Sequence, residues 1–320
     1  MAEATLYKDA DTIDVTAPTG GYTSGEVIQL TDGRAAFVSG LRSPAAGGGA
    51  TLKTSGQVTL PKTSGVVILE GDEIFWDRSA GSATPLKAVA GGDFSAGVAV
   101  ADAAAAATTV IVDLNKKPVY TIDIMRDPTD TVIVLTAGTP AVSMGPGYAA
   151  ITFSATAEAQ KADIMSKHSI PVTVPFIVEG RVAIYDIGDN AALDINIGIA
   201  NDTHATDADA ITESCLLHLD GAGDLSILAE SDDGATEVAA TDTTVDAVDD
   251  TYFDFRMDCR NLADIQIYIN GVNVLPASVF KLNAATGPLK LLAHLEKTSD
   301  NTTAEVRVSH LAIRATDLAA

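Results

Sequence analysis

This 320-residue chain contains many short apolar runs separated by glycine-rich turns. This feature limits its possible folds more than any other. In residues 66–77, one apolar run ends at Leu69 and a second begins at Ile74, with Glu70, Gly71 and Asp72 between them. The apolar residues suit a buried pleated surface, and the glycine supplies the backbone freedom of a tight turn. The stretch is therefore predicted to form a β-hairpin at the centre of a small β-barrel.

Similar runs surround this stretch between residues 22 and 114. Asp32-Gly33 separates two apolar segments and is a specific signal for a hairpin. Residues 43–50 are expected to form a loop, and the alanine run at 101–107 either a loop or a helical turn. Five or six strands at this spacing favour a small barrel. Besides residues 66–77, the strands are expected within residues 25–38, 51–62, 94–103 and 108–114.

A second β domain is predicted to follow. The boundary is placed at residues 115–118, because Pro118 cannot continue a sheet ladder, so the domains span 1–115 and 118–320. In residues 252–258, apolar and charged side chains alternate, which indicates a strand with one face in the core. Asn270-Gly271 signals a two-residue turn. Further strands are expected near residues 131–137, 148–155, 176–187, 215–231, 289–296 and 306–315. The fold class is thus all-β: a small N-terminal barrel followed by a C-terminal antiparallel sandwich.

Composition limits the classes of partner. The chain has 20 Lys and Arg against 43 Asp and Glu, a formal net charge of −23, which disfavours direct binding to nucleic acid. No apolar run reaches the roughly 18 residues that suggest a membrane helix, and the first residues lack the pattern of a secretory signal. We expect a soluble protein made in the host cytoplasm. Cys215 and Cys259 are too far apart for a zinc or redox pair, and they are predicted to be buried, unpaired thiols.

The N-terminal part resembles a known family. The residues that carry the resemblance are the start MAEAT with Tyr7, the strand start SGEVI at 24–28, EGD at 70–72 leading to FWD at 75–77, GVA at 97–99 and TVIV at 109–112. Their order is similar to that in the tailed-phage head decoration, or cement, proteins. Some members of that family carry the label "RecA/RadA-like phage recombinase". The resemblance covers about the first 114 residues. It implies a structural protein on the outer surface of the virion head, bound to the major capsid protein, and the family includes trimers at three-fold sites.

The recombinase label is testable in the sequence. An ATPase of that class needs the phosphate loop GxxxxGK followed by Ser or Thr, whose amides and lysine bind phosphate. No such segment occurs, and the glycines at 47–49 are followed by Ala50, Thr51 and Leu52. We therefore exclude the ATPase function.

An acid-rich arm precedes the barrel. In residues 4–18 the sizeable apolar side chains are Leu6, Tyr7, Ile13 and Val15, which makes them the candidate capsid contacts. The arm is expected either to add a strand to a neighbouring protein or to pair within its own barrel.

The C-terminal strands at 252–258, 265–272, 289–296 and 306–315 resemble those of concanavalin-like and laminin-G-like jelly rolls. That resemblance implies glycan binding, in some members with calcium. Asp202, Asp207 and Asp209 are the candidate calcium ligands, although the loop lacks the central glycine and final glutamate of an EF-hand. The alternative is a solvated acidic loop with no cofactor.

No catalytic motif supports an enzyme. The histidines show no HxH or HExxH spacing, and His218 and His294 fall within strand patterns, which predicts sheet-face residues rather than metal ligands. No GxSxG elbow occurs. The predicted function is structural decoration of a phage head by a non-enzymatic homo-oligomer, with a trimer favoured. The alternative is a virion module that binds host or environmental glycans through its second domain.

Overall fold

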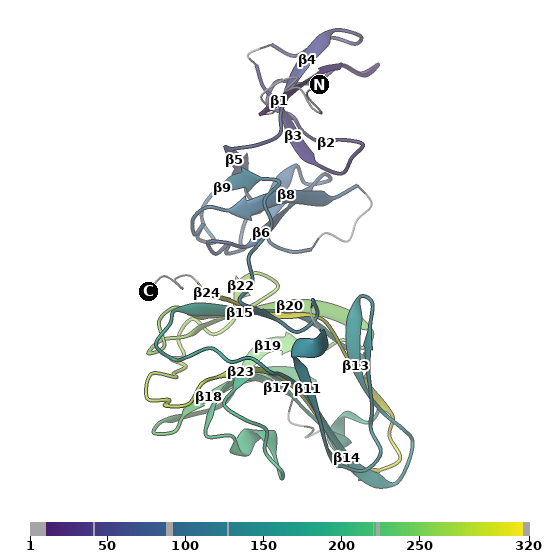
Figure 1. Cartoon of the computed structure of the whole chain (residues 1–320), viewed down its shortest axis with the longest axis vertical. Helices are drawn as coiled ribbons and strands as arrows, with labels where there is room; N and C mark the ends of the chain where they lie inside the picture. The colour runs from purple at the N-terminus through teal and green to yellow at the C-terminus, as the bar shows by residue number, and fades with distance from the viewer. Residues whose placement is uncertain are drawn as a thin grey trace, which may run out of the picture. The chain divides into compact units, whose positions relative to one another are not determined.

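The computed structural model describes residues 11–40, 42–87, 92–126, 128–219, 221 and 225–315. The chain divides into unit 1 (Met1–Val119) and unit 2 (Tyr120–Ala320) (Figure 1). Both units are built from antiparallel strands, which confirms the all-β prediction. Within the described ranges the helical elements are three short 3-10 turns: η1 (Pro128–Asp130), η2 (Asn190–Ala192) and η3 (Ala208–Ala210). No helix in these ranges has the length and apolar character to cross a bilayer.

Unit 1 contains two antiparallel sheets of short strands. The first has the order β1-β4-β3-β2 and the second the order β5-β9-β8-β6-β7. Edge strands β5 and β7 of the second sheet approach at one isolated bridge, between Lys62 and Ala83, so the predicted barrel is an open, curled sheet in the described residues. The strands are β1 Thr12–Thr16, β2 Val27–Gln29, β3 Ala35–Val38, β4 Gly49–Lys53, β5 Gln57–Pro61, β6 Glu73–Asp77, β7 Ser82–Thr84, β8 Phe94–Ala99 and β9 Thr109–Leu114.

The core of unit 1 forms around Trp76 on β6, which is 8% exposed and packs in one cluster with Ile74 and Phe94. Asn115 connects the two sheets. Its amide donates to the carbonyls of Ala35 (2.9 Å) and Thr54 (2.7 Å), and its Oδ1 accepts from the Ala35 N–H. Asn115 has φ 59°, a left-handed conformation that asparagine tolerates better than most residues.

The structure corrects one predicted hairpin. Residues 66–69 do not pair with β6; Ile68 instead forms an isolated bridge to Ala103. Backbone groups of residues 66–69 bond to charged side chains instead. The Asp72 carboxylate accepts from the Leu69 N–H at 2.8 Å, and Lys62 Nζ donates to the Val66 carbonyl at 2.6 Å. The hairpin at Asp32-Gly33 is confirmed, since β2 pairs with β3. The alanine run at 101–107 forms no helix.

Unit 2 is a sandwich of two antiparallel sheets (Figure 1). The eight-stranded sheet has the order β12-β13-β24-β15-β20-β21-β22, with β10 also pairing with β24. Its strands are β10 Ile122–Asp123, β12 Ala141–Gly145, β13 Tyr148–Phe153, β15 Phe176–Asp186, β20 Thr251–Cys259, β21 Gln266–Ile269, β22 Val272–Asn273 and β24 Ala304–Ala315.

The seven-stranded sheet of unit 2 has the order β11-β14-β23-β16-β17-β18-β19. Its strands are β11 Thr131–Ala137, β14 Glu158–Ser166, β16 Leu193–Ala200, β17 Glu213–Leu219, β18 Ser226–Asp233, β19 Glu237–Asp246 and β23 Lys290–Asp300.

One large apolar core lies between the two sheets of unit 2. It includes Phe255 and Met257, whose neighbours Asp254 and Arg256 alternate to the opposite face as predicted. Cys215 and Cys259 are both buried in this core and unpaired, as expected. The turn at Asn270 and Gly271, with φ 49° and 78°, connects β21 to β22 and confirms the two-residue hairpin. Of the predicted hairpin tip at 220–223, only Gly221 lies within the described residues.

Candidate functional site

Strand β1 is the described part of the N-terminal arm. Two of the candidate capsid contacts, Leu6 and Tyr7, lie outside the described residues. Ile13 and Val15 alternate with Asp14 on β1, and both are half-buried. Val15 packs against a small core cluster of unit 1. In the described ranges β1 pairs only with β4 and is an edge of its sheet, so its other side is available to a further strand.

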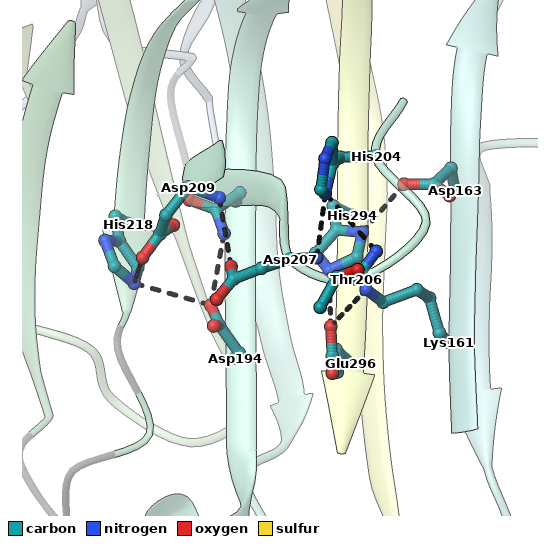
Figure 2. Close-up of polar contacts among 11 residues, drawn as sticks. Lys161, Asp163, Asp194, His204, Thr206, Asp207, Asp209, His218, His294 and Glu296 are labelled. Carbon is teal, nitrogen blue, oxygen red and sulfur yellow. Dashed lines mark hydrogen bonds and ion pairs between the residues drawn. The ribbon is translucent and has the colours of Figure 1, made fainter. Parts of the chain in front are cut away.

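Charged and polar side chains occupy the outer face of the seven-stranded sheet of unit 2. Strand alternation explains their position, because most of their neighbours along the strands, such as Ala162, Ile195 and Leu217, belong to the apolar core. We call this surface the polar face (Figure 2). It consists of Lys161 and Asp163 on β14, Asp194 and Asn196 on β16, His218 on β17, Glu230 on β18, and His294 and Glu296 on β23.

A buried ion pair lies at the β14–β23 side of the polar face. Asp163 Oδ1 and His294 Nδ1 are 2.7 Å apart, and both side chains are almost fully buried. Lys161 Nζ lies 2.6 Å from Glu296 Oε2 in the same group. Burial opposes the charge on His294, but the hydrogen bond to Asp163 and the carboxylate of Glu296, 3.6 Å from Nε2, dominate and raise its pKa to about 9. The imidazolium form is therefore favoured at neutral pH.

A second cluster surrounds His218. Its Nε2 lies 3.4 Å from Asp194 Oδ1 and 3.5 Å from Asp209 Oδ2, and its Nδ1 lies 3.5 Å from Glu230 Oε2. Burial disfavours the cation, but these carboxylates raise the pKa of His218 to about 10. Burial and the charge of Glu230 raise the pKa of Asp209 to about 7. Three carboxylates thus converge on one imidazole.

The loop at 201–212 brings Asp209 to the polar face. Ala208 and Ile211 of this loop pack in one apolar cluster with Leu216 and Leu292, which lie on the same face of the sheet. Figure 2 shows Asp209 beside His218 and Asp194. The loop therefore covers part of the polar face.

The three predicted calcium ligands do not converge in this arrangement. Asp202 accepts from the Thr203 N–H, and Asp207 caps η3 by accepting from the Asp209 N–H at 3.0 Å. Among the described residues, the group of His, Cys, Asp and Glu donor atoms within 4.8 Å of one another comprises Asp194, Asp209 and His218. Asp209 alone of the predicted three belongs to it.

Sequence reasoning missed the residues of β14 and β16, which were not among the predicted strands. Lys161, Asp163, Asp194 and Asn196 were consequently not considered. The usable signal is the alternation in LDINIGIA, where isoleucine at 195, 197 and 199 follows the period of a strand. His218 and His294 lie on a sheet face as predicted, but both are buried and surrounded by carboxylates.

The outer face of the eight-stranded sheet gathers aromatic and arginine side chains. Arg307 lies over the rings of Tyr148 and Tyr185, with its guanidinium carbon 4.6 and 3.0 Å from their centroids. Arg181 lies over Tyr252 at 5.3 Å. Glu305 pairs with Arg307, and Asp254 pairs with Arg181 at 2.6 Å. We call this surface the tyrosine–arginine face, comprising Tyr148, Arg181, Tyr185, Tyr252, Arg256, Tyr268 and Arg307.

Comparison with known proteins finds one family. Residues 7–114 match the family described as "Phage cement protein". This span accounts for about a third of the chain and lies within unit 1. No curated protein has a significantly matching sequence.

Comparison with solved structures finds carbohydrate-related domains. The carbohydrate recognition domain of Emp47p is 11% identical, with a TM-score of 0.44 over 60% of this chain and 93% of that chain. The carbohydrate-binding module CBM66 from Bacillus subtilis is 12% identical, with a TM-score of 0.36 over 57% and 94%. A structure from work on endo-acting O-glycanases of the human gut microbiota is 9% identical, with a TM-score of 0.46 over 62% and 100%.

Proposed function

We propose that this chain is a non-enzymatic decoration protein that binds the outer surface of a phage head through unit 1. The observation that carries the proposal is the match of residues 7–114 to the phage cement protein family, a span contained in one compact unit. Its partner is the major capsid protein, and unit 2 extends the particle surface. A protein that binds only the assembled lattice stabilises that lattice by mass action.

Two properties of the chain support this function. Edge strand β1 offers backbone groups for strand addition, with Ile13 and Val15 as side chains to fix its register. The net charge of −23 argues against nucleic acid as the partner, because binding to DNA depends on basic side chains at the phosphates. A surface of this sign suits the outside of a head rather than its DNA-filled interior.

The decisive experiment uses heads assembled without this protein. Purified full-length chain is mixed with such heads, and the mixture is sedimented and imaged. We expect the chain to sediment with the heads, to occupy symmetry-related positions on their outer surface and to raise the temperature at which they open. If the chain stays in the supernatant at saturating concentration, the proposed function is wrong.

We further propose that the bound form is a trimer. Three copies that repeat one heterologous contact close a ring, which fits the three-fold positions of an icosahedral lattice. Light scattering of the free protein and the positions seen on the head test this point. A monomer in solution that also lies singly at hexamer centres contradicts it.

A second candidate function is glycan binding by unit 2. The observation that favours it is the tyrosine–arginine face, since Tyr185 is 37% exposed and aromatic rings with arginines suit sugar rings and their polar groups. A glycan array probed with the full-length chain tests it. Replacement of Tyr148 and Tyr185 by Ala is expected to abolish any signal, whereas Val272→Ala on β22 leaves it unchanged. Equal signals from both variants contradict this location.

A further inference from the structure

Side chains from three elements of unit 2 converge at the His218 cluster. Its three donors come from separate elements: Asp194 from β16, His218 from β17 and Asp209 from η3 in the loop at 201–212. Their donor atoms lie within 4.8 Å of one another. The two sheet residues sit on adjacent paired strands, where Asn196 opposes His218, so the sheet fixes two of the three donors.

The separations in this cluster are too long for hydrogen bonds but suit a metal. An N–H···O hydrogen bond measures about 2.7–3.2 Å. In a tetrahedral zinc site with bonds of about 2.0–2.2 Å, neighbouring ligand atoms lie about 3.3–3.6 Å apart. His218 Nε2 is 3.4 Å from Asp194 Oδ1 and 3.5 Å from Asp209 Oδ2. Both distances equal the edge of such a tetrahedron.

The hydrogen bonding of His218 is an independent observation. Its side chain is only 3% exposed, and neither ring nitrogen has a hydrogen-bond partner. The Oδ1 of the fully buried Asn196 also lacks a partner, while its amide donates to Asp194. Such groups are costly to bury without a partner. His294 on the same face differs at one nitrogen, because its Nδ1 contacts Asp163 at 2.7 Å in an ordinary hydrogen bond, whereas both nitrogens of His218 lack one.

We propose that Asp194, Asp209 and His218 bind a divalent transition-metal ion of the zinc class. His218 Nε2 is the nitrogen ligand, and the carboxylates of Asp194 and Asp209 are the oxygen ligands. Glu230, 3.5 Å from His218 Nδ1, is the outer partner that orients the imidazole. A water molecule takes the fourth position, reached past the part-exposed Asp209. This site is independent of head decoration.

The donor set decides the class of metal. Calcium takes six to eight oxygen ligands, whereas this cluster offers one imidazole and few oxygens. Imidazole together with carboxylates suits zinc and its first-row neighbours. The metal therefore differs from calcium, for which the aspartates of the loop were candidate ligands, and it uses one of those three aspartates.

Metal binding has a structural consequence for unit 2. Asp209 belongs to the covering loop, whereas Asp194 and His218 belong to the sheet. A bound ion therefore fastens the loop at 201–212 onto the polar face. The bound form of unit 2 is expected to resist heat and proteolysis in this loop better than the metal-free form.

The test is a titration of tag-free, chelator-treated full-length chain with ZnCl₂ in 0.15 M salt, followed by calorimetry and thermal unfolding. The ligand variant is Asp209→Asn. The matched control is Asp207→Asn, which removes the same charge from the same loop and keeps a side-chain oxygen for the cap of η3. A parallel titration with CaCl₂ tests the class of metal.

We expect one equivalent of Zn²⁺ to bind and to raise the melting temperature of unit 2. Because loss even of an outer-shell partner commonly costs 10- to 100-fold in affinity, Asp209→Asn should weaken binding by at least about tenfold. Asp207→Asn should weaken binding much less than Asp209→Asn, because it removes no ligand and keeps the side-chain oxygen that accepts from the Asp209 N–H. Absence of Zn²⁺ binding, equal affinities of the two variants, or tighter binding of Ca²⁺ than of Zn²⁺ would each overturn the proposal.

Discussion

The buried charges of unit 1 and those of the polar face of unit 2 are held in different ways. In unit 1, Lys62 and Asp72 are buried and each bonds to the backbone of residues 66–69, so their charges shape a loop. In unit 2 the buried charges of the polar face contact one another, as Asp163 and His294 do. A charge bonded to its own backbone is explained by the local fold. When charged side chains from strands far apart in the sequence are buried together, the local fold does not explain their burial. A bound ligand or a specific ion pair does.

The two units also differ in the surfaces that they offer to a partner. The strands of unit 1 have three to six residues, and its edge strand β1 is available for pairing. Unit 2 has strands of up to 12 residues, and its functional candidates lie on sheet faces. We therefore expect unit 1 to recognise its partner through an edge and unit 2 through side chains.

The largest expected effect is on head binding, when the two units are made as separate fragments. A chain ending after residue 119 should still bind heads, because the family match lies entirely within it. Residues 120–320 alone should not bind. Sedimentation with undecorated heads measures both, and circular dichroism checks that each fragment is folded. Binding by 120–320 without binding by 1–119 would reverse the roles of the units.

Removing the central side chain of unit 1 is the next largest change. Trp76 is 8% exposed in the core, and truncating a buried aromatic to Ala typically costs about 3–5 kcal/mol. Trp76→Ala should lower the unfolding temperature of unit 1 and leave that of unit 2 unchanged. Ile111→Ala is the control. Ile111 is 44% exposed, so this substitution should lower the free energy of unfolding by about 0.5 kcal/mol or less. Unchanged unfolding with lost head binding would move Trp76 to the capsid contact.

Alkaline pH should weaken unit 2 selectively. The pKa of His294 is raised to about 9 in the folded state, above the usual value near 6.5. Its contribution is therefore complete below pH about 6.5 and is lost as pH rises through 9, by an amount on the order of 3 kcal/mol. All five histidines lie in unit 2, so unit 1 has no histidine whose titration changes its stability.

Thermal unfolding between pH 6 and 9.5, with a chelator present, measures this slope. His294→Gln should unfold at a lower temperature at pH 6 and show a smaller loss of stability with rising pH than the unchanged chain. An identical slope in both proteins would assign the pH dependence to other groups.

Changing the edge strand of unit 1 should have the smallest effect on stability. Ile13 is half-buried on β1, so Ile13→Lys should alter unfolding by about 1 kcal/mol at most. Head binding should fall clearly, because a lysine on an edge strand disfavours pairing. Val272→Lys on β22 of unit 2 serves as the control and should bind normally. Normal binding by both variants would remove β1 from the contact.

The sequence predicted those parts of the fold that are governed by local chemistry. The turns at Asp32-Gly33 and Asn270-Gly271 were correct because two residues determine the backbone reversal. The hairpin at 66–77 was wrong because Ile68 finds its partner at Ala103, more than thirty residues away. Local patterns identify a strand more readily than they identify its neighbour.

The candidate site in unit 2 was largely beyond prediction for the same reason. Asp163 and His294 are 131 positions apart in the chain and meet only because β14 pairs with β23. Asp209 was singled out as an acidic residue, but its companions Asp194 and His218 come from two other elements. Strand order, which alternation alone does not reveal, decides which polar residues share a face.

The position of β24 has a consequence for synthesis of the chain. This strand, Ala304–Ala315, lies between β13 and β15 and is the last of the described strands to leave the ribosome. Unit 1 is complete at β9 and can fold while unit 2 is still being made. Until β24 emerges, β13 and β15 lack the strand that joins them and expose open edges. The eight-stranded sheet of unit 2 therefore cannot be completed before β24 has been made, and the open edges of β13 and β15 are where unfinished copies can pair with one another.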